Sequence, residues 1–432
     1  MLSKLGDAMF PSASSKAARR IPIPLELGLD AAGLLFFPVL VLVPHGIAPL
    51  VSIAGALAFG LVLPNGKAAL RTVQVPLLLL GALLVWAAAS AAWSVEPRHS
   101  LLIAGRLAGL LAAGFALTEA ANAILNPGRL LLCFYAGLAV ALLLAPIQLA
   151  TDGLLTRPLM TRGFFAPQLN QAADTLSILA LPASAALVQR GRVVLGLLLA
   201  AVILAVISSL VGSAAKAALG AGILIAPLLY LCPRAVAWAA AIACILIIIT
   251  APLTFARMAR LEAVTETAEG IKFSAWHRLM IWSFAGDRIA ERPLAGWGLD
   301  ASRAIPGGDE PIYQGRVWLP LHPHNTAIQL WLELGAPGAA LFALSLAWLW
   351  LGLAATPWPR LFTAAAGASL TSGIVAAMGV YGIWQESWIG TLWFSLFVIL
   401  AMARWVSGRS AAARSAQSAL DGAARRGLLR DD

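Results

Sequence analysis

Apolar segments of about 20 residues recur along most of this chain, and they constrain its fold more than any other feature. A helix of that length is what crosses the hydrocarbon core of a bilayer. The 432 residues are 60% hydrophobic and only 12% charged, which leaves too few charges to cover the surface of a water-soluble domain. The sequence therefore predicts an all-α polytopic membrane protein, and it excludes both a soluble enzyme and a disordered chain.

Proline, glycine and charged residues separate the apolar runs and set the expected helix ends. Twelve spans are predicted, at 25–43, 46–63, 75–93, 101–120, 130–150, 172–188, 193–210, 213–231, 235–252, 326–353, 361–380 and 385–404. The three cysteines lie in or beside apolar stretches, so neither a disulfide nor a thiolate metal site is expected.

Lysines and arginines are more frequent in the loops on one side of these spans, which the positive-inside rule makes cytoplasmic. We expect a cytoplasmic N-terminal segment (1–24), spans one to nine (25–252), a periplasmic domain (253–325), spans ten to twelve (326–404) and a basic cytoplasmic tail (405–432). The net charge of +10 follows from this orientation, so nucleic acid is not an expected partner. The tail is expected to be poorly ordered and attracted to anionic lipid.

The long segment 253–325 is expected to fold as a domain, because its basic residues are matched by as many acids. Within it, apolar side chains at helical spacing predict a helix over 271–291, which Pro293 ends.

Histidines give the first indication of chemistry, because all five fall on the predicted periplasmic side. Neutral imidazole is the natural general base near pH 7. For His45 and His99 an interfacial polar role is favoured. His322 and His324 differ, because they precede Asn325 at the mouth of a span, and Glu333 follows about two helical turns further on.

A catalytic metal or another cofactor is not expected. Two histidines separated by one residue need further ligands to hold zinc, and the chain contains no HExxH, CxxC or Asp-x-Asp motif.

Cationic side chains on the same predicted side give a second indication. Arg157 and Arg162 lie in the polar loop 151–171, Arg278 lies on the expected helix 271–291, and Lys216 lies near the outer end of a span. Each alone is compatible with an interfacial snorkelling role. Together, and without metal-binding acids, they indicate an anionic lipid headgroup such as a pyrophosphate. This pattern fits a lipid-phosphate glycosyltransferase, and it also fits a transporter of an anionic substrate.

Several short motifs resemble those of the O-antigen ligase and polymerase superfamily. The run from Leu319 to Gly338 contains the His-Asn pair, the following Gln and the Glu-x-Gly-x-x-Gly of that signature. Three more elements occur upstream, namely Pro293-Leu-Ala-Gly-Trp-Gly298, Arg162-Gly-Phe with Asn170, and Trp93-Ser-Val-Glu-Pro97. One departure is Gly212-Ser-Ala-Ala-Lys216, where many members carry Ser-Arg-Gly, and Lys216 is the candidate replacement for that charge.

The resemblance implies a reaction and roles for residues. An O-antigen glycan on undecaprenyl pyrophosphate would be transferred, without a metal and with inversion, to a sugar hydroxyl of lipid A-core at the inner membrane. His324 would be the base, and Arg162 and Arg278 would hold the pyrophosphate and stabilise its growing charge. His322, Asn325, Lys216, Arg157, Asn170 and Glu333 are the expected substrate-binding residues. The expected partners are this donor, this acceptor and membrane lipid.

Two alternatives remain at this point. A polymerase of the same superfamily shares the motifs and differs in its acceptor. A transporter would be expected to show repeated halves and interrupted spans, and the sequence indicates neither.

Overall fold

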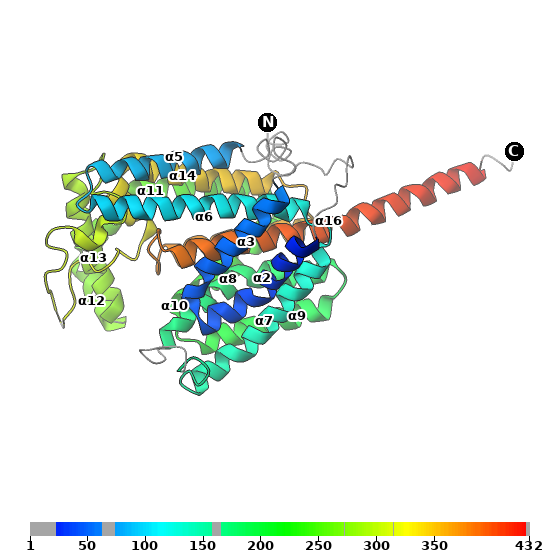
Figure 1. Cartoon of the computed structure of the whole chain (residues 1–432), viewed down its shortest axis with the longest axis horizontal. Helices are drawn as coiled ribbons and strands as arrows, with labels where there is room; N and C mark the ends of the chain where they lie inside the picture. The colour runs from blue at the N-terminus through cyan, green and yellow to red at the C-terminus, as the bar shows by residue number, and fades with distance from the viewer. Residues whose placement is uncertain (1–22, 63–73, 158–165, 272, 314, 429–432) are drawn as a thin grey trace.

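The computed structural model describes residues 23–62, 74–157, 166–271, 273–313 and 315–428. Within these ranges the regular structure is helical, apart from an isolated antiparallel bridge between Pro311 and Val317. Figure 1 shows most helices side by side in one elongated bundle. The prediction of an all-α polytopic membrane protein is confirmed.

Every predicted span coincides with a helix. These are α2 (Ile23–Leu42), α3 (Ile47–Val62), α5 (Gln74–Ala89), α6 (Pro97–Ala123), α7 (Pro127–Ala150), α8 (Asn170–Gln189), α9 (Val193–Ser209), α10 (Ser213–Leu231), α11 (Pro233–Met258), α14 (Thr326–Ala354), α15 (Arg360–Ala377) and α16 (Glu386–Leu428). Among the described residues, ten helices are long and apolar enough to cross a membrane, and α5 and α9 are shorter apolar helices.

Local sequence signals explain where these helices begin. Pro97, Pro127 and Pro233 lie in the first turns of α6, α7 and α11, where proline costs no hydrogen bond because the first N–H groups lack intrahelical acceptors. The Asn126 side chain caps α7 by accepting from Arg129 N at 3.0 Å.

Among the described residues, α8 is the most enclosed spanning helix, and 89% of the residues in its apolar segment are buried. It packs against α9, α10, α15 and α16. Its buried residues include small side chains such as Ala172, Ala173 and Ala183, which let neighbouring helices approach closely in a membrane.

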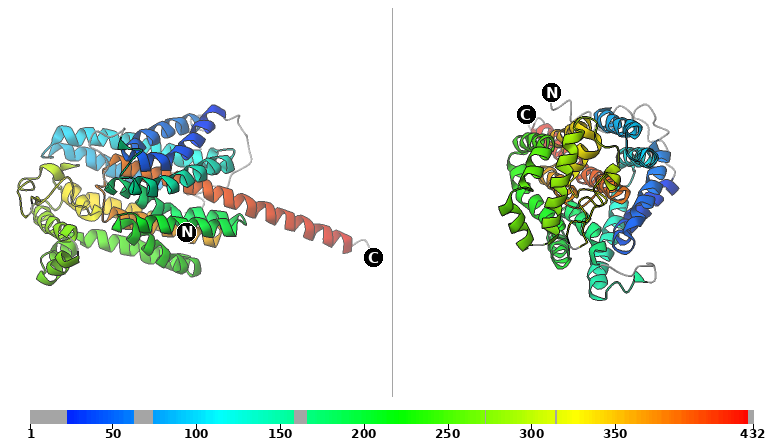
Figure 2. Two further views of the ribbon diagram at one scale, coloured as in Figure 1. Left: turned by 90° about the horizontal axis from the view of Figure 1, so that it is seen from below. Right: turned by 90° about the vertical axis from the view of Figure 1, so that its left-hand side faces the viewer.

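Two further helices, α12 (Glu262–Ile271) and α13 (Phe273–Glu291), lie at one end of the bundle, while the C-terminal part of α16 projects from the other end (Figure 2). Helix α13 matches the helix predicted over 271–291, whereas α12 was not predicted. The short helix η6 (Ala301–Ala304) and the loop that follows connect α13 to α14.

The expectation that the basic tail is poorly ordered stays a prediction. Helix α16 continues to Leu428, well past the end of the predicted span. The segment is rich in alanine, arginine and serine, and alanine and arginine are among the strongest helix formers, so the helix extends beyond the bundle (Figure 1).

Candidate active site

His322 and His324 lie together immediately before α14. Their ring centroids are 4.2 Å apart and their planes are inclined by 61°. His324 has a φ of 52°, in the left-handed region that few residues other than glycine adopt. Directly after it, the buried Asn325 side chain caps α14 by accepting from Ile328 N at 3.1 Å. Because this cap fixes the start of α14, it also fixes the position of both histidines.

Hydrogen bonds define the tautomer of each histidine. His324 Nδ1 lies 3.0 Å from the Val380 carbonyl oxygen, which can only accept, so Nδ1 carries the proton and Nε2 of the neutral ring keeps its lone pair. His322 Nδ1 lies 3.2 Å from the His324 backbone nitrogen, which can only donate, so neutral His322 carries its proton on Nε2. One ring therefore offers a proton acceptor and the other a donor.

Burial and neighbouring charges keep both rings neutral. Burial, followed by the charges of His324, Arg303 and Arg278, lowers the pKa of His322 to about 3. Burial also lowers the pKa of His324; the hydrogen bond to Val380 opposes this shift, and the charges of Arg278 and His277 add to it. A neutral imidazole with a free Nε2 is the form that a general base requires.

Arg278 is a half-buried cation close to this pair, since its charge acts on the pKa of both histidines. Burial lowers its own pKa, but a guanidinium stays charged at any physiological pH. Among the described residues it forms no ion pair with an acid. A half-buried cation without a carboxylate partner is suited to an anionic ligand.

Two contacts connect α13, which carries Arg278, to the segment that carries the histidines. Trp282 Nε1 donates to the Pro323 carbonyl at 3.0 Å. His277 Nε2 donates to the Val317 carbonyl at 2.9 Å. The relative position of Arg278 and the two histidines is therefore set by the domain rather than by one flexible loop.

Glu333 is completely buried, and several groups donate to its carboxylate. The donors are Asp300 N at 2.8 Å, Ser302 Oγ at 2.5 Å, Gln329 Nε2 at 3.1 Å and Trp384 Nε1. Because these donors come from three parts of the chain, the carboxylate connects α14 to the η6 turn and to the loop before α16. Glu333 thus positions neighbouring segments, and its carboxylate is enclosed by protein.

Helix α14 is interrupted at Gly335, which has a φ of 64° and a ψ of −163°. The carbonyls of Leu332 and Glu333 are instead hydrogen-bonded by Trp297 N at 2.9 Å and Gly298 N at 2.8 Å. No interrupted span was expected from the sequence, and the break in α14 shows that this expectation is wrong. A side chain at Gly296 would collide with the Glu333 backbone, which explains a glycine at this close approach.

The Trp-Ser-x-x-Pro loop joins the same unit. Trp93 Nε1 donates to the Ala295 carbonyl at 3.0 Å, and Val95 N donates to the Trp297 carbonyl at 3.4 Å. Three motifs that are far apart in the sequence thus form one hydrogen-bonded scaffold beside the histidines.

The other predicted site residues are more dispersed. Arg162 lies outside the described residues. Arg157 is exposed, and its Nε donates to the Asp152 carbonyl at 3.0 Å. Lys216 is exposed in the first turn of α10. Asn170 begins α8, where its Oδ1 is buried without a hydrogen-bond partner among the described residues and lies against Gly212.

Sequence reasoning missed the pair of Asp174 and Tyr381. The Tyr381 hydroxyl lies 2.6 Å from Asp174 Oδ2, and its ring stacks on Trp388 with centroids 4.2 Å apart. This contact joins α8 to the loop whose Val380 carbonyl accepts the hydrogen bond from His324 Nδ1. The signal in the sequence is an acid, Asp174, within the predicted span 172–188.

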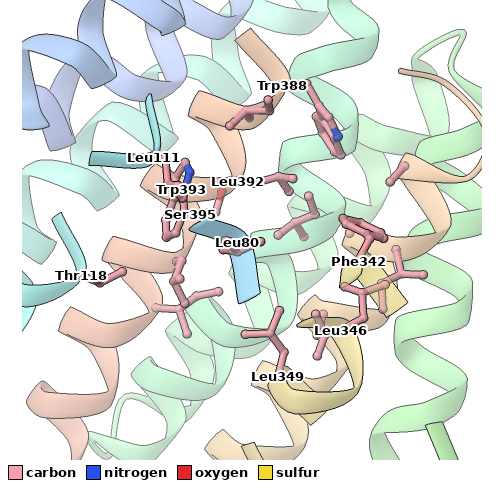
Figure 3. Close-up of a pocket in the computed structure, with 18 of the residues that line it drawn as sticks. Leu80, Leu111, Thr118, Phe342, Leu346, Leu349, Trp388, Leu392, Trp393 and Ser395 are labelled. Carbon is pink, nitrogen blue, oxygen red and sulfur yellow. The ribbon is translucent and has the colours of Figure 1, made fainter. Parts of the chain in front are cut away.

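An apolar cavity of about 480 Å³ lies within the bundle. Its lining begins at Thr326 and Trp384 and continues to Leu353, near the other end of α14. Figure 3 shows the middle of the cavity, where side chains such as Phe342 and Leu392 point toward one another from α14 and α16. The cavity falls within the size range of small-molecule sites.

Comparisons with known proteins show the family of this chain. The sequence pattern described as O-antigen ligase matches residues 195–343, a range that includes Arg278, both histidines and Glu333. A protein of Rickettsia conorii, whose name describes a polysaccharide ligase, is 30% identical over 313 residues, or 71% of this chain and 74% of that protein. This chain belongs to the O-antigen ligase superfamily. It is therefore a multi-pass membrane protein. The superfamily comprises ligases and polymerases, which are glycosyltransferase-like enzymes.

Shorter matches occur with other proteins whose names describe polysaccharide ligases. One from Rickettsia bellii is 38% identical over 133 residues, or 30% of this chain and 32% of that protein. One from Rickettsia prowazekii is 40% identical over 120 residues, or 27% of this chain and 29% of that protein.

Proposed function

We propose that this protein is an O-antigen ligase. It transfers a glycan from undecaprenyl pyrophosphate to a sugar hydroxyl of lipid A-core on the periplasmic face of the inner membrane. The observation that carries the proposal is the neutral His324 ring with its free Nε2, beside the unpaired charge of Arg278. A proton acceptor and an anion-binding cation in one site are the two groups that such a transfer needs.

The reaction is a single displacement. The acceptor hydroxyl oxygen forms a bond to the anomeric carbon of the donor sugar, and its proton passes to Nε2 of His324. The bond from that carbon to the pyrophosphate oxygen breaks, and the pyrophosphate leaves with the electron pair. One displacement inverts the configuration of the anomeric carbon.

Arg278 binds the pyrophosphate and stabilises the negative charge that grows as it leaves. Arg162 is proposed to share this role from the loop 151–171. His322 complements them, because its Nε2–H is available to donate to a phosphate or sugar oxygen. Since pyrophosphate is a good leaving group and these groups neutralise its charge, the proposed reaction needs no metal or other cofactor.

The apolar cavity supports a lipid-linked donor. Its lining is formed by side chains of α5, α6, α8, α14, α15 and α16 and includes Thr326, two residues after His324. We place the isoprenoid chain in this cavity, with its pyrophosphate directed toward Arg278. Asn325 positions His324 through the α14 cap. Lys216, Asn170 and Arg157 are proposed to contact the donor or acceptor.

The two alternatives differ from this proposal in specific ways. A polymerase would use the same groups with a second lipid-linked glycan as acceptor. A transporter is less well supported, because the backbone groups freed at Gly335 bind protein N–H groups instead of lining a path for substrate.

Deletion of the gene, with the lipopolysaccharide resolved on a gel, distinguishes these functions. A ligase predicts the loss of all glycan-capped forms, with lipid-linked glycan accumulating. Core carrying a single repeat would indicate a polymerase. An unchanged gel pattern would contradict both enzymatic proposals.

A further inference from the structure

Three aromatic side chains that the proposed reaction does not use meet beside the active site. Phe273 and Trp276 come from the first turn of α13, and Tyr313 comes from the loop before α14. The Phe273 and Trp276 rings are 5.3 Å apart at 25°, while Tyr313 is inclined by 77° to Trp276 at 5.9 Å. These three rings form what we call the aromatic corner. Tyr313 is 52% exposed.

Backbone contacts hold this corner in place. Ile312 N donates to the Arg316 carbonyl at 2.8 Å, and Arg316 N donates to the Tyr313 carbonyl at 3.0 Å, so the loop forms a tight hairpin. The same hairpin receives the His277 hydrogen bond on the Val317 carbonyl. Rings held before a ligand arrives lose little entropy when it binds.

Charge near the corner argues against a role in binding lipid. Helix α12 contacts α13 and exposes Glu262, Glu266 and Glu269, which an anionic membrane surface would repel. On the hairpin, Arg316 is exposed, lies 5.8 Å from the Phe273 ring centroid, and forms no ion pair with an acid among the described residues. Its N–H groups are available to hydroxyl or carboxylate oxygens.

Sugar rings fit this combination of flat apolar faces and an open guanidinium. The C–H groups of a pyranose ring carry slight positive charge and pack on the negative face of an aromatic ring, while sugar hydroxyls accept hydrogen bonds from guanidinium. We propose that the aromatic corner is a glycan-binding subsite that takes pyranose rings remote from the bond being formed. The inference rests on the proposed function.

Helix geometry sets how far this subsite lies from the chemistry. Trp276 and Arg278 are two residues apart, which places them about 200° apart around α13 and separates them by about the 10–12 Å width of a helix. That separation exceeds one sugar ring and is comparable to two or three. The corner should therefore act on long glycans and not on a single sugar.

The experiment compares variants of the purified full-length protein on two donors, undecaprenyl pyrophosphate carrying one sugar and the same lipid carrying several. Trp276→Ala and Tyr313→Ala should raise KM for the long donor by about two- to tenfold, with kcat and the short-donor KM unchanged. Tyr313→Phe keeps the ring and should resemble the wild type. Ile271→Ala, which truncates a 76% exposed apolar side chain of α12, is the matched control.

The source of the sugar rings is found by varying the acceptor as well. A KM effect that depends on donor length assigns the corner to the donor glycan, and one that depends on the number of acceptor sugars assigns it to the acceptor; both support a pyranose subsite. Equal effects on short and long substrates, or no effect on either, would overturn the inference. Equal effects together with poorer retention in lipid bilayers would assign the corner to the membrane interface, which also overturns it.

A binding measurement separates this inference from the proposed function. Glycan released from the source cells' envelope by mild acid and fractionated by length is titrated against the wild type and Tyr313→Ala. If the wild type transfers nothing but binds long glycan more tightly than the variant does, the proposed function fails and the subsite stands. If transfer works and binding is the same in both proteins, the subsite fails alone.

Discussion

The Nδ1 atom of His324 lies 3.0 Å from the backbone carbonyl oxygen of Val380. This contact leaves Nε2 as the nitrogen of the neutral ring that is free to accept a proton. Nearby, the Tyr381 hydroxyl lies 2.6 Å from Asp174 Oδ2 on α8, so the loop that orients His324 is itself attached to the most enclosed helix of the bundle.

The pH dependence of transfer should reflect the lowered pKa of His324. Because its protonated form is disfavoured by burial and by the charge of Arg278, the rate should stay level as the pH falls through about 6.5, the ordinary pKa of histidine. It should fall only as the pH passes through the lowered pKa. Arg278→Gln removes a charge that lowers this pKa, so its loss of activity should begin at a higher pH.

Arg278→Lys is the control, because it keeps the charge and loses the planar fork. It should keep the wild-type pH profile while weakening pyrophosphate binding. Values of kcat/KM, obtained from initial rates between about pH 4.5 and 8, test both variants. This range lies on either side of the ordinary histidine pKa. An acid limb at the same pH in Arg278→Gln and the wild type would contradict the proximity of this charge to the base.

Glu333→Gln should act mainly on stability. The amide brings N–H groups toward atoms that donate to the carboxylate, so at least one buried donor loses its acceptor, at a cost of about 1–3 kcal/mol. Thermal unfolding in detergent measures the loss. Glu310→Gln, at an exposed acid of the same domain, should change stability by less than about 0.5 kcal/mol. A stable Glu333→Gln protein with a much higher donor KM would instead support the substrate-binding role that the sequence suggested.

The sequence predicted the spans and the identity of the central histidines, but not the contacts that orient them. Hydropathy is a local property, so each of the twelve predicted spans has a matching helix. Three hydrogen-bond partners of Glu333 are Asp300, Ser302 and Trp384, which are 31 to 51 residues away in the sequence. Hydropathy contains no information about such pairings. The same limit applies to Asp174 and Tyr381, which are 207 residues apart.

The break at Gly335 shows a related limit. Glycine and proline are common in membrane helices, where neighbouring segments satisfy the freed backbone groups. The sequence Gly335-Ala-Pro337 therefore did not by itself distinguish a continuous helix from an interrupted one. The break is possible because the N–H groups of Trp297 and Gly298, from another part of the chain, donate to the carbonyls that it frees.

Topology can be tested by cysteine labelling. In a chain whose native Cys133, Cys232 and Cys244 are replaced, Glu310→Cys should react with a membrane-impermeant reagent in intact cells, because the segment 253–325 is predicted to be periplasmic. Arg192→Cys, in a loop predicted to be cytoplasmic, should react only after lysis. Protection at position 310 that lysis removes would reverse the predicted orientation.

Chelation tests the absence of a metal from the proposed chemistry. Because Arg278, Arg162 and His322 are proposed to neutralise the pyrophosphate, transfer by the purified enzyme should survive excess EDTA. Activity that EDTA abolishes and that Mg²⁺ or Mn²⁺ restores would show that these side chains do not replace a metal.

The most direct measurement of the central claim is the turnover of His324→Ala beside His322→Ala, with His45→Ala as an exposed control. The kinetics use purified enzyme, a synthetic lipid-pyrophosphate donor, and donor affinity measured separately. If Nε2 of His324 is the base, its removal should lower kcat by about 10²- to 10⁴-fold with donor binding largely kept, and His322→Ala should be milder. Near-wild-type turnover of His324→Ala, with His322→Ala inactive, would contradict the assignment.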